Sequence, residues 1–87
     1  MNKLRKIIDH YGQEHQIAKA NEELHELIQA IIEDDKDHIT EEMADVVVML
    51  WQLVIIYDID VLEIPKIMDY KINRTIKRIE QEGAFDE

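Results

Sequence analysis

Apolar residues recur along most of the chain at intervals of three and four, which is the spacing of amphipathic helices. The apolar face of residues 4–8 stops at Tyr11-Gly12, so the pattern predicts a brief first helix and a bend. A second helix is predicted from about residue 13 to a polar loop at residues 33–38. Its apolar positions are Ile17, Ala20, Leu24, Leu27, Ile28 and Ile31.

A third helix is predicted to follow this loop, with Thr40 as its N-cap. Glu41 and Glu42 then lie in its first turn, where the helix dipole favours acidic side chains. Residues 46–57 are apolar on nearly every side except at Gln52. A helix of this kind is expected to be surrounded by other helices.

The fourth predicted helix begins near Asp60, which forms a capping-box pattern with Glu63. Pro65 falls within its first turn or two, where proline is tolerated. The helix continues to about residue 81, and Gly83 is expected to end it. Its apolar positions are Ile64, Ile67, Met68, Ile72, Ile76 and Ile79.

Composition supports an all-α fold, because 46% of the residues are hydrophobic and there are only two Gly and one Pro. The 87 residues are expected to form one domain, residues 1–87. The expected architecture is a four-helix unit with a short first helix, an antiparallel hairpin of the second and third helices, and a basic C-terminal helix. So small a core gives marginal stability, which favours self-association.

The net charge of -10 would repel a nucleic-acid backbone, so a nucleic-acid polymer is not an expected partner. There is no Cys for a disulfide or a thiolate metal site. No segment approaches the roughly 20 apolar residues of a membrane span, and no apolar stretch long enough for a signal peptide follows the N-terminus. A cytoplasmic protein without a membrane partner is therefore expected.

Two acidic clusters border the most apolar segments. Glu23 and Glu26 are three residues apart in the second helix, and Glu42 and Asp45 have the same spacing in the third. Taken singly, the clusters can be explained as a solvated face and as compensation of a helix dipole. A short loop should however pack the two helices antiparallel, which would bring the four carboxylates together.

Four converging carboxylates would form a site of oxygen ligands, which suits Mg²⁺ or Mn²⁺ better than Zn²⁺. Mg²⁺ in proteins commonly keeps waters and takes substrate phosphates as further ligands. Two such ions could activate a water and stabilise a leaving phosphate oxygen. The pattern therefore predicts phosphate chemistry in an acidic protein.

The fourth helix carries the basic residues that this chemistry needs. Five of the ten Lys and Arg residues fall between Lys66 and Arg78. Lys71, Arg74 and Arg78 follow one side of the helix and could clamp a triphosphate, since Arg makes forked contacts to phosphate oxygens. The alternative is an ordinary solvated basic face.

These residues carry a family resemblance. The segment Glu22-Glu23-Leu24-His25-Glu26, followed by Glu42-Met43-Ala44-Asp45, resembles the EExxE and ExxD signature of the MazG-like, all-α nucleoside triphosphate pyrophosphohydrolases. The approach to the first motif, with Lys19, and the apolar run after Asp45 also look similar. The resemblance covers roughly residues 8–81.

The resemblance implies hydrolysis of a nucleoside or deoxynucleoside triphosphate between its α and β phosphates. It implies that Mg²⁺, or Mn²⁺ as the alternative, is bound by Glu23, Glu26, Glu42 and Asp45. Glu22 would contact a metal ligand from outside the ligand set, or it would be the base that orients the attacking water. Lys19, Lys71, Arg74 and Arg78 would bind phosphate. Family members are dimers or tetramers, often with sites completed across subunits.

Family members often carry a Lys on the fourth helix, an Asn four residues later and an Arg three beyond. Lys71 and Arg78 fit this pattern, but Thr75 stands at the Asn position and Asn73 lies two residues earlier. This leaves open a non-catalytic oligomerisation or regulatory module that binds nucleotide or metal without turnover. A third hypothesis is a di-iron four-helix bundle. Glu22-x-x-His25 matches the Glu-x-x-His motif of such bundles, although the chain contains only one copy of it. Trp51 is expected in the core, with base stacking as the alternative, and His10, His15 and His38 on the surface.

Overall fold

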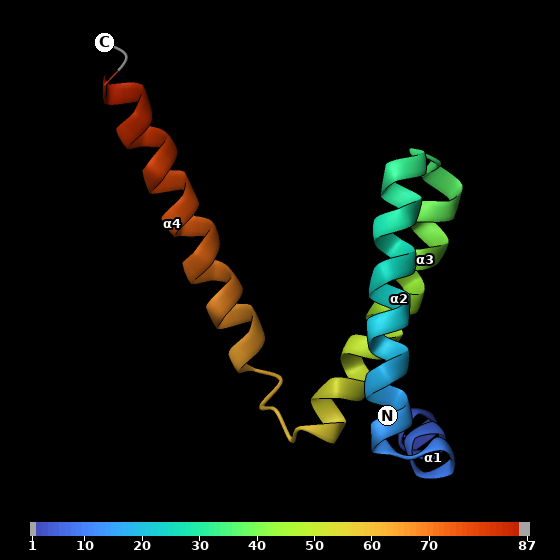
Figure 1. Ribbon diagram of the computed structural model, residues 1–87. Coiled ribbons are helices and arrows are strands. Elements are labelled where there is room, and N and C mark those ends of the chain that lie inside the picture. The colour runs from blue at the N-terminus through green and yellow to red at the C-terminus, as the bar shows by residue number, and fades with distance from the viewer. Residues whose placement is uncertain (1, 86–87) are drawn as a thin grey trace.

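The computed structural model describes residues 2–85, which form four helices and no strand (Figure 1). The helices are α1 (Asn2–Tyr11), α2 (Gln13–Glu33), α3 (Lys36–Ile56) and α4 (Glu63–Phe85). The prediction of an all-α chain with a short first helix is confirmed. None of the helices between residues 2 and 85 is both long and apolar enough to cross a membrane.

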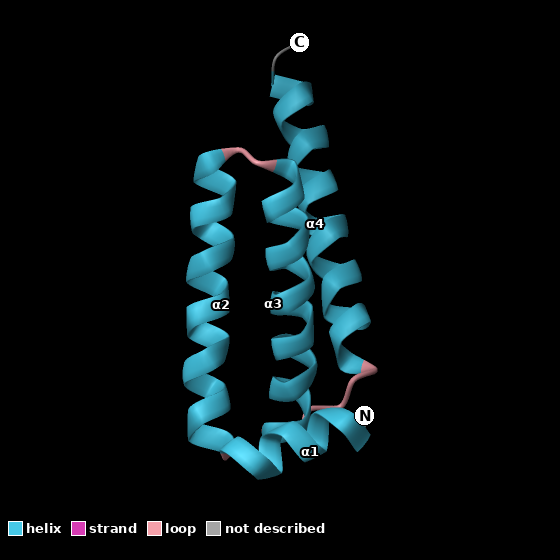
Figure 2. Cartoon of the chain, turned by 90° about the vertical axis from the view of Figure 1, so that its right-hand side faces the viewer, coloured by secondary structure: helices cyan, strands magenta, loops and turns pink. Residues whose placement is uncertain are grey.

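The bend between α1 and α2 is made by Gly12. Its φ of 92° lies in a region that residues with a Cβ rarely adopt. Its N–H donates to the carbonyl of Ile8 (2.7 Å), and its carbonyl accepts from the N–H of Gln16 (3.1 Å). As a result α1 lies across one end of the α2–α3 hairpin (Figure 2).

The hairpin itself is closed by two aspartates. Asp34, with φ 58°, ends α2 and donates its N–H to the carbonyl of Ile31 (3.1 Å). Asp35 caps α3, because its Oδ1 accepts from the N–H groups of Asp37 (3.1 Å) and His38 (3.3 Å). So short a connection makes α2 and α3 antiparallel neighbours, as the sequence predicted (Figure 2).

The predicted N-cap of the third helix is therefore wrong. Thr40 lies inside α3, where its Oγ1 donates to the carbonyl of Lys36 (2.8 Å). The helix begins earlier because Asp35 supplies the capping oxygen, and the loop predicted at residues 33–38 shrinks accordingly. This shift places His38 on a helix rather than in a loop.

Two details of α4 also differ from expectation. The Asp60 side chain accepts from the N–H of Leu62 (3.0 Å), whereas the N–H of Glu63 donates to the backbone carbonyl of Asp60 (3.0 Å), so the predicted capping box does not form. Pro65 does lie in the first turn of α4, as predicted. Gly83 lies within the helix and does not end it.

The core between the helices is small and partly polar. Its buried apolar residues are Ile8, Ala20, Ala30, Val46 and Met49. Gln52 is only 2% exposed, and its side-chain oxygen accepts from the amide of Gln16 at 2.8 Å. The one polar residue in the apolar run of α3 thus points into the core, because a buried partner on α2 satisfies it.

The remaining apolar residues of α3 are largely uncovered. Val47, Val48 and Leu50 are exposed, and Trp51 is 41% exposed. The expectations that other helices surround this segment and that Trp51 lies in the core are therefore wrong for a single chain. The physical reason is that α4 makes no contact with the other helices described and leaves this face open.

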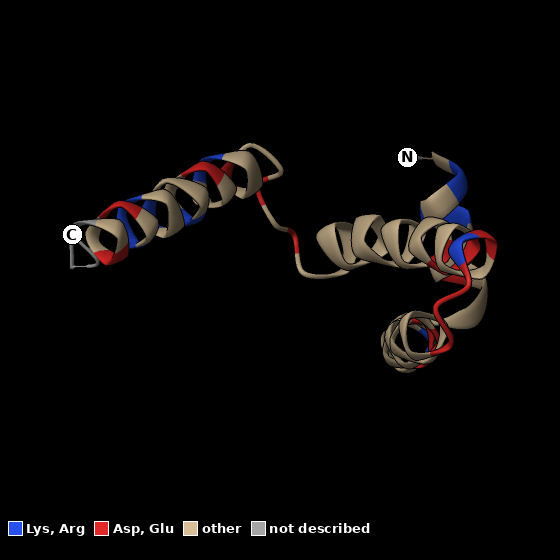
Figure 3. Cartoon of the chain, turned by 90° about the horizontal axis from the view of Figure 1, so that it is seen from above, with Lys and Arg blue, Asp and Glu red and all other residues tan. Residues whose placement is uncertain are grey.

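Figures 1 and 3 view the chain from perpendicular directions, and both show α4 apart from the hairpin. The Cα radius of gyration is 17.3 Å, against about 12 Å for a compact domain of this length. A single copy is therefore an extended molecule, and the apolar faces of α3 and α4 meet no other helix among residues 2–85.

Candidate metal centre

Three glutamates from the two arms of the hairpin come together at one place. Glu23 and Glu26 project from α2 and Glu42 from α3, and each offers one carboxylate oxygen such that these atoms all lie within 4.8 Å of one another. Glu23 and Glu42 are buried, with exposed fractions of 7% and 9%, and Glu26 is exposed. The group is therefore anchored in the helix interface and open on one side.

The two buried glutamates are incompletely satisfied. Oε2 of Glu23 and Oε2 of Glu42 are both buried and have no hydrogen-bond partner. A buried carboxylate oxygen without a partner is costly, because burial removes the water that would otherwise solvate it. A divalent cation would supply the missing partner to both oxygens, and an all-carboxylate donor set fits Mg²⁺ or Mn²⁺.

Lys19 provides the nearest positive charge on α2. Its Nζ lies 3.3 Å from Oε1 of Glu23 and 3.6 Å from Oε2 of Glu22, one turn along the helix. The hydrogen bond with Glu23 raises the pKa of Lys19 above its ordinary value, and the charges of Glu23 and Glu22 act in the same direction. Lys19 thus engages one oxygen of Glu23 and leaves the other unpaired.

His38 occupies the corresponding position beside Glu42. Its Nδ1 lies 3.1 Å from Oε2 of Glu33, and its Nε2 lies 3.4 Å from Oε1 of Glu42. The hydrogen bond with Glu33 raises the pKa of His38 above its ordinary value, and the nearby charge of Glu42 adds to this. The sequence predicted only that His38 lies on the surface, so its contacts with Glu33 and Glu42 were not expected.

A signal for this contact exists in the sequence. His38 and Glu42 are four residues apart, a spacing that places two side chains on one face of a helix. The spacing did not predict the contact, because a third helix that begins only at Thr40 leaves His38 outside the helix.

Asp45 and Glu22 lie next to the three grouped glutamates rather than among them. Asp45 is exposed on α3, one turn beyond Glu42, and does not belong to the group defined by the 4.8 Å spacing. Glu22 is exposed on α2 and pairs with Lys19. His25, which the di-iron reading would need as a ligand, is also exposed and outside the group.

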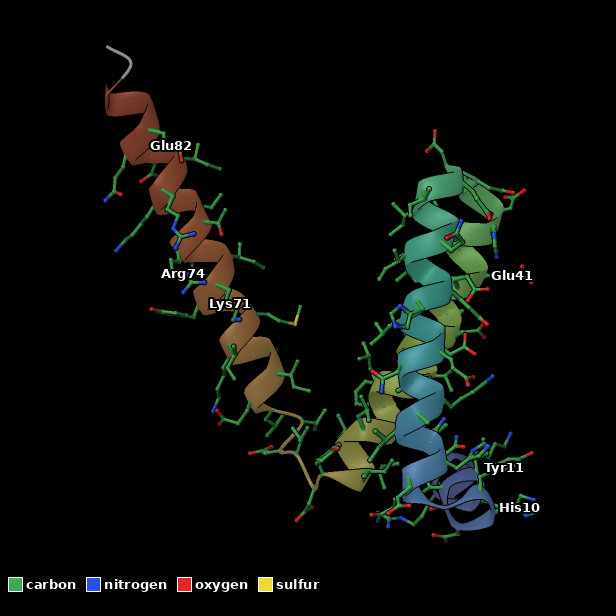
Figure 4. The ribbon with its side chains drawn as sticks, viewed as in Figure 1. His10, Tyr11, Glu41, Lys71, Arg74 and Glu82 are labelled. Carbon is green, nitrogen blue, oxygen red and sulfur yellow. The ribbon has the colours of Figure 1, made fainter. Side chains whose placement is uncertain are left out.

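The basic residues of α4 are not brought to this centre within one chain. Lys71, Arg74 and Arg78 are exposed on a helix that makes no contact with the hairpin. Figure 4 shows Lys71 and Arg74 on α4, well separated from the helix that carries Glu41. The guanidinium of Arg74 lies 5.7 Å from the ring centroid of Tyr70, a cation–π contact within α4.

An antiparallel helical hairpin that presents glutamates from both arms, two of them buried with unpaired oxygens, defines an α-helical domain with a candidate divalent-metal centre. The sequence of the chain was compared with models of known protein families. The model described as the MazG nucleotide pyrophosphohydrolase domain matches residues 12–81, and the chain belongs to this family. No curated protein and no solved structure matched the chain. The predicted family is thus confirmed, and membership indicates nucleotide pyrophosphohydrolase activity in general.

Proposed function

We propose that the protein is a Mg²⁺-dependent pyrophosphohydrolase of nucleoside or deoxynucleoside triphosphates. It would cleave between the α and β phosphates and release the monophosphate and pyrophosphate. The observation that carries the proposal is the pair of buried, unpaired oxygens of Glu23 and Glu42, on facing helices of a MazG domain. Such oxygens are best explained by a cation that belongs to the working protein.

Glu23, Glu26 and Glu42 would hold the metal, with Asp45 as the fourth ligand. Asp45 lies one helical turn after Glu42, so that both side chains project from the same face of α3. When bound, Mg²⁺ would neutralise phosphate charge and lower the pKa of a water at the site. It would also allow an anionic nucleotide to approach a protein with a net charge of -10.

Glu22 and Lys19 would act on the substrate side of the centre. The carboxylate of Glu22 is exposed next to Glu23, where it could orient the attacking water and accept its proton. Lys19 balances the charge of Glu23 in the free protein. With a metal at Glu23, its ammonium group would be free to contact a phosphate oxygen, as its flexible side chain permits.

The remaining phosphate contacts would come from Lys71, Arg74 and Arg78 of a second copy of the chain. Within one copy these residues lie on a helix that contacts neither α2 nor α3. By helical periodicity they flank the apolar stripe of α4 that includes Ile72 and Ile79. Packing this stripe on the open apolar face of another hairpin would carry the basic flank toward a carboxylate group.

The amount of exposed surface supports such self-association. The chain exposes 7357 Å², whereas a compact monomer of 10.4 kDa exposes about 5,400 Å². The excess of about 2,000 Å² per copy, or about 4,000 Å² for a pair, lies in the range that obligate homodimer interfaces bury. We therefore propose that the working unit is a homodimer, or a tetramer built from such dimers.

The test is a panel of nucleoside and deoxynucleoside triphosphates incubated with Mg²⁺, in which pyrophosphate and orthophosphate release are measured separately. The variant Glu42→Gln removes one charge at the centre with little change of shape. Glu41→Gln is the matched control, because Glu41 is the neighbouring residue and is exposed. Pyrophosphate is expected as the primary product from the wild type and Glu41→Gln, with a loss of at least about 100-fold in Glu42→Gln.

Orthophosphate as the primary product, or unchanged pyrophosphate release in Glu42→Gln, would contradict the mechanism. A folded, metal-loaded protein that turns over no nucleotide would instead support the second candidate, a module that binds nucleotide or metal without hydrolysis. The observation that favours this alternative is the altered pattern on α4, where Thr75 donates to the carbonyl of Lys71 (3.0 Å) in place of the Asn expected there.

A further inference from the structure

His38 is the only histidine among residues 2–85 that the structure pairs with two carboxylates from two helices. Its ring spans from Glu33, the last residue of α2, to Glu42 on α3, with nitrogen–oxygen distances of 3.1 Å and 3.4 Å. We propose that His38 is a positioning residue that holds the Glu42 carboxylate in the orientation required for metal binding. This inference rests on the proposed metal centre and adds a residue to it.

The position of the imidazole is set by the way α3 begins. Asp35 accepts the backbone N–H of His38 (3.3 Å), so the capped first turn fixes the Cα of His38 relative to the hairpin. The contact of Nδ1 with Glu33 then fixes the ring plane from the α2 side. Nε2 is consequently aimed at Glu42, which lies one turn further along the same face of α3.

The two carboxylate oxygens of Glu42 have different surroundings. Oε1 faces His38, while Oε2 is the buried oxygen that has no hydrogen-bond partner. A glutamate side chain can rotate about several bonds, so the contact at Oε1 removes orientations that the Glu42 carboxylate would otherwise sample. Holding Oε1 leaves Oε2 directed into the helix interface, where Glu23 has its own unpaired oxygen.

The arrangement parallels that of Lys19 on the other arm. Lys19 contacts Oε1 of Glu23 at 3.3 Å and leaves its Oε2 unpaired, as His38 does for Glu42. Each buried glutamate is therefore held at one oxygen by a side chain of its own helix, four residues before it in the sequence. The centre thus has one supporting residue on each arm, and of the two only Lys19 was among the predicted site residues, as a phosphate contact.

Two substitutions of His38 test whether a donor at the position of Nε2 is required, rather than any polar side chain. In His38→Gln the side-chain amide nitrogen can take the place of Nε2 and donate to Glu42. In His38→Asn the shorter amide can reach only the position of Nδ1, toward Glu33, and the contact with Glu42 is lost. His10→Asn is the matched control for removing an imidazole, because His10 is exposed on α1 (Figure 4).

The readout is the affinity for Mn²⁺, measured from the electron paramagnetic resonance signal of the free ion during titration of the 87-residue chain. His38→Asn is expected to weaken Mn²⁺ binding about 10-fold or more, the usual cost of losing a group that orients a metal ligand. His38→Gln should restore the affinity to within a few-fold of the wild type, and His10→Asn should leave it unchanged.

Equal affinity in His38→Asn and the wild type, or an equal loss in the Asn and Gln variants, would overturn the positioning role. Tighter binding in His38→Asn would also overturn it, because it would show that the imidazole only competes with the metal for Glu42. In each of these cases the wild type still binds Mn²⁺ and the proposed function stands. Failure of the wild type itself to bind Mn²⁺ would overturn both proposals.

Discussion

Glu23 of α2 and Glu42 of α3 face one another across the hairpin, each with one buried carboxylate oxygen that has no hydrogen-bond partner. Two acidic groups in this relationship repel one another, and burial makes the repulsion harder to screen. The hairpin is therefore expected to be under electrostatic strain at this point until a cation binds. This relationship links the metal chemistry of the centre to the stability of the fold.

The stability of the protein should therefore depend on Mg²⁺. At a free Mg²⁺ concentration 100 times its Kd, the free energy of unfolding of the wild type should rise by about 2.7 kcal/mol relative to EDTA. Glu42→Gln should lose most of this gain, because a ligand charge is missing, whereas Glu41→Gln should keep it. Chemical denaturation with and without Mg²⁺ measures both quantities. Equal gains in the two variants would contradict the assignment of Glu42 as a ligand.

Lys19 should matter more to stability without the metal than with it. Its ammonium group and the proposed cation would neutralise the same carboxylate, that of Glu23. Lys19→Gln is therefore expected to lower the thermal unfolding midpoint in EDTA and to lower it less in saturating Mg²⁺. Lys36→Gln, at an exposed position on α3, is the control for loss of a positive charge. A decrease that is the same in both conditions would contradict the shared role.

In the absence of metal, stability should also depend on the protonation of His38. Contact with Glu33 raises the pKa of this imidazole above its ordinary value of 6.5. A raised pKa in the folded state means that the stabilisation is fully present below about pH 6.5 and is lost as the pH rises through the folded-state value. Thermal unfolding in EDTA between pH 5.5 and 8.5 should show this loss in the wild type and not in His38→Gln. Parallel pH profiles for the two proteins would refute it.

The buried pair Gln16 and Gln52 should behave as a unit. Gln52→Leu leaves the amide of Gln16 buried without its 2.8 Å partner, which should cost about 1–3 kcal/mol in the free energy of unfolding. Gln16→Leu in the same protein removes the second polar group and should recover part of the loss. A double-mutant cycle by urea denaturation gives the coupling energy. Strictly additive losses would mean that the two side chains do not depend on one another.

Self-association should depend on the apolar stripe of α4. Ile72→Asp places a charge within this stripe and should convert the oligomer to monomers, because a buried unpaired carboxylate is unfavourable. Asn73→Asp adds the same charge at the adjacent position, on the polar side of the helix, and should leave the oligomer intact. Sedimentation velocity distinguishes the two. A monomeric wild type would contradict the proposed working unit.

The proposed sharing of sites between copies has its own test. Glu42→Gln and a triple variant with Ala at positions 71, 74 and 78 should each be inactive, the first in the metal centre and the second in phosphate binding. Random exchange of equal amounts of the two proteins should make about half of the dimers mixed, and one of the two sites in each mixed dimer combines two intact halves, so about a quarter of the wild-type activity should return. No recovery on mixing would place both halves of a site in one chain.

Much of the fold followed from local rules that a sequence displays directly. Apolar spacing gave the four helices, and Gly12 marked the bend because few other residues adopt its φ of 92°. The helix boundaries were less accurate: the start of α3 depended on whether Asp35 or Thr40 supplied the capping oxygen, and both residue types cap well. That single difference also hid the contact between His38 and Glu42.

The sequence by itself determined the family, the antiparallel hairpin and which acidic residues its two arms carry. These features depend on spacing within a helix and on the shortness of a loop. Only the tertiary structure decided which carboxylates are buried together, that Gln52 points inward, and that α4 lies away from the hairpin. These features depend on packing between segments far apart in the chain, and periodicity along one helix carries no information about which partner covers its apolar face.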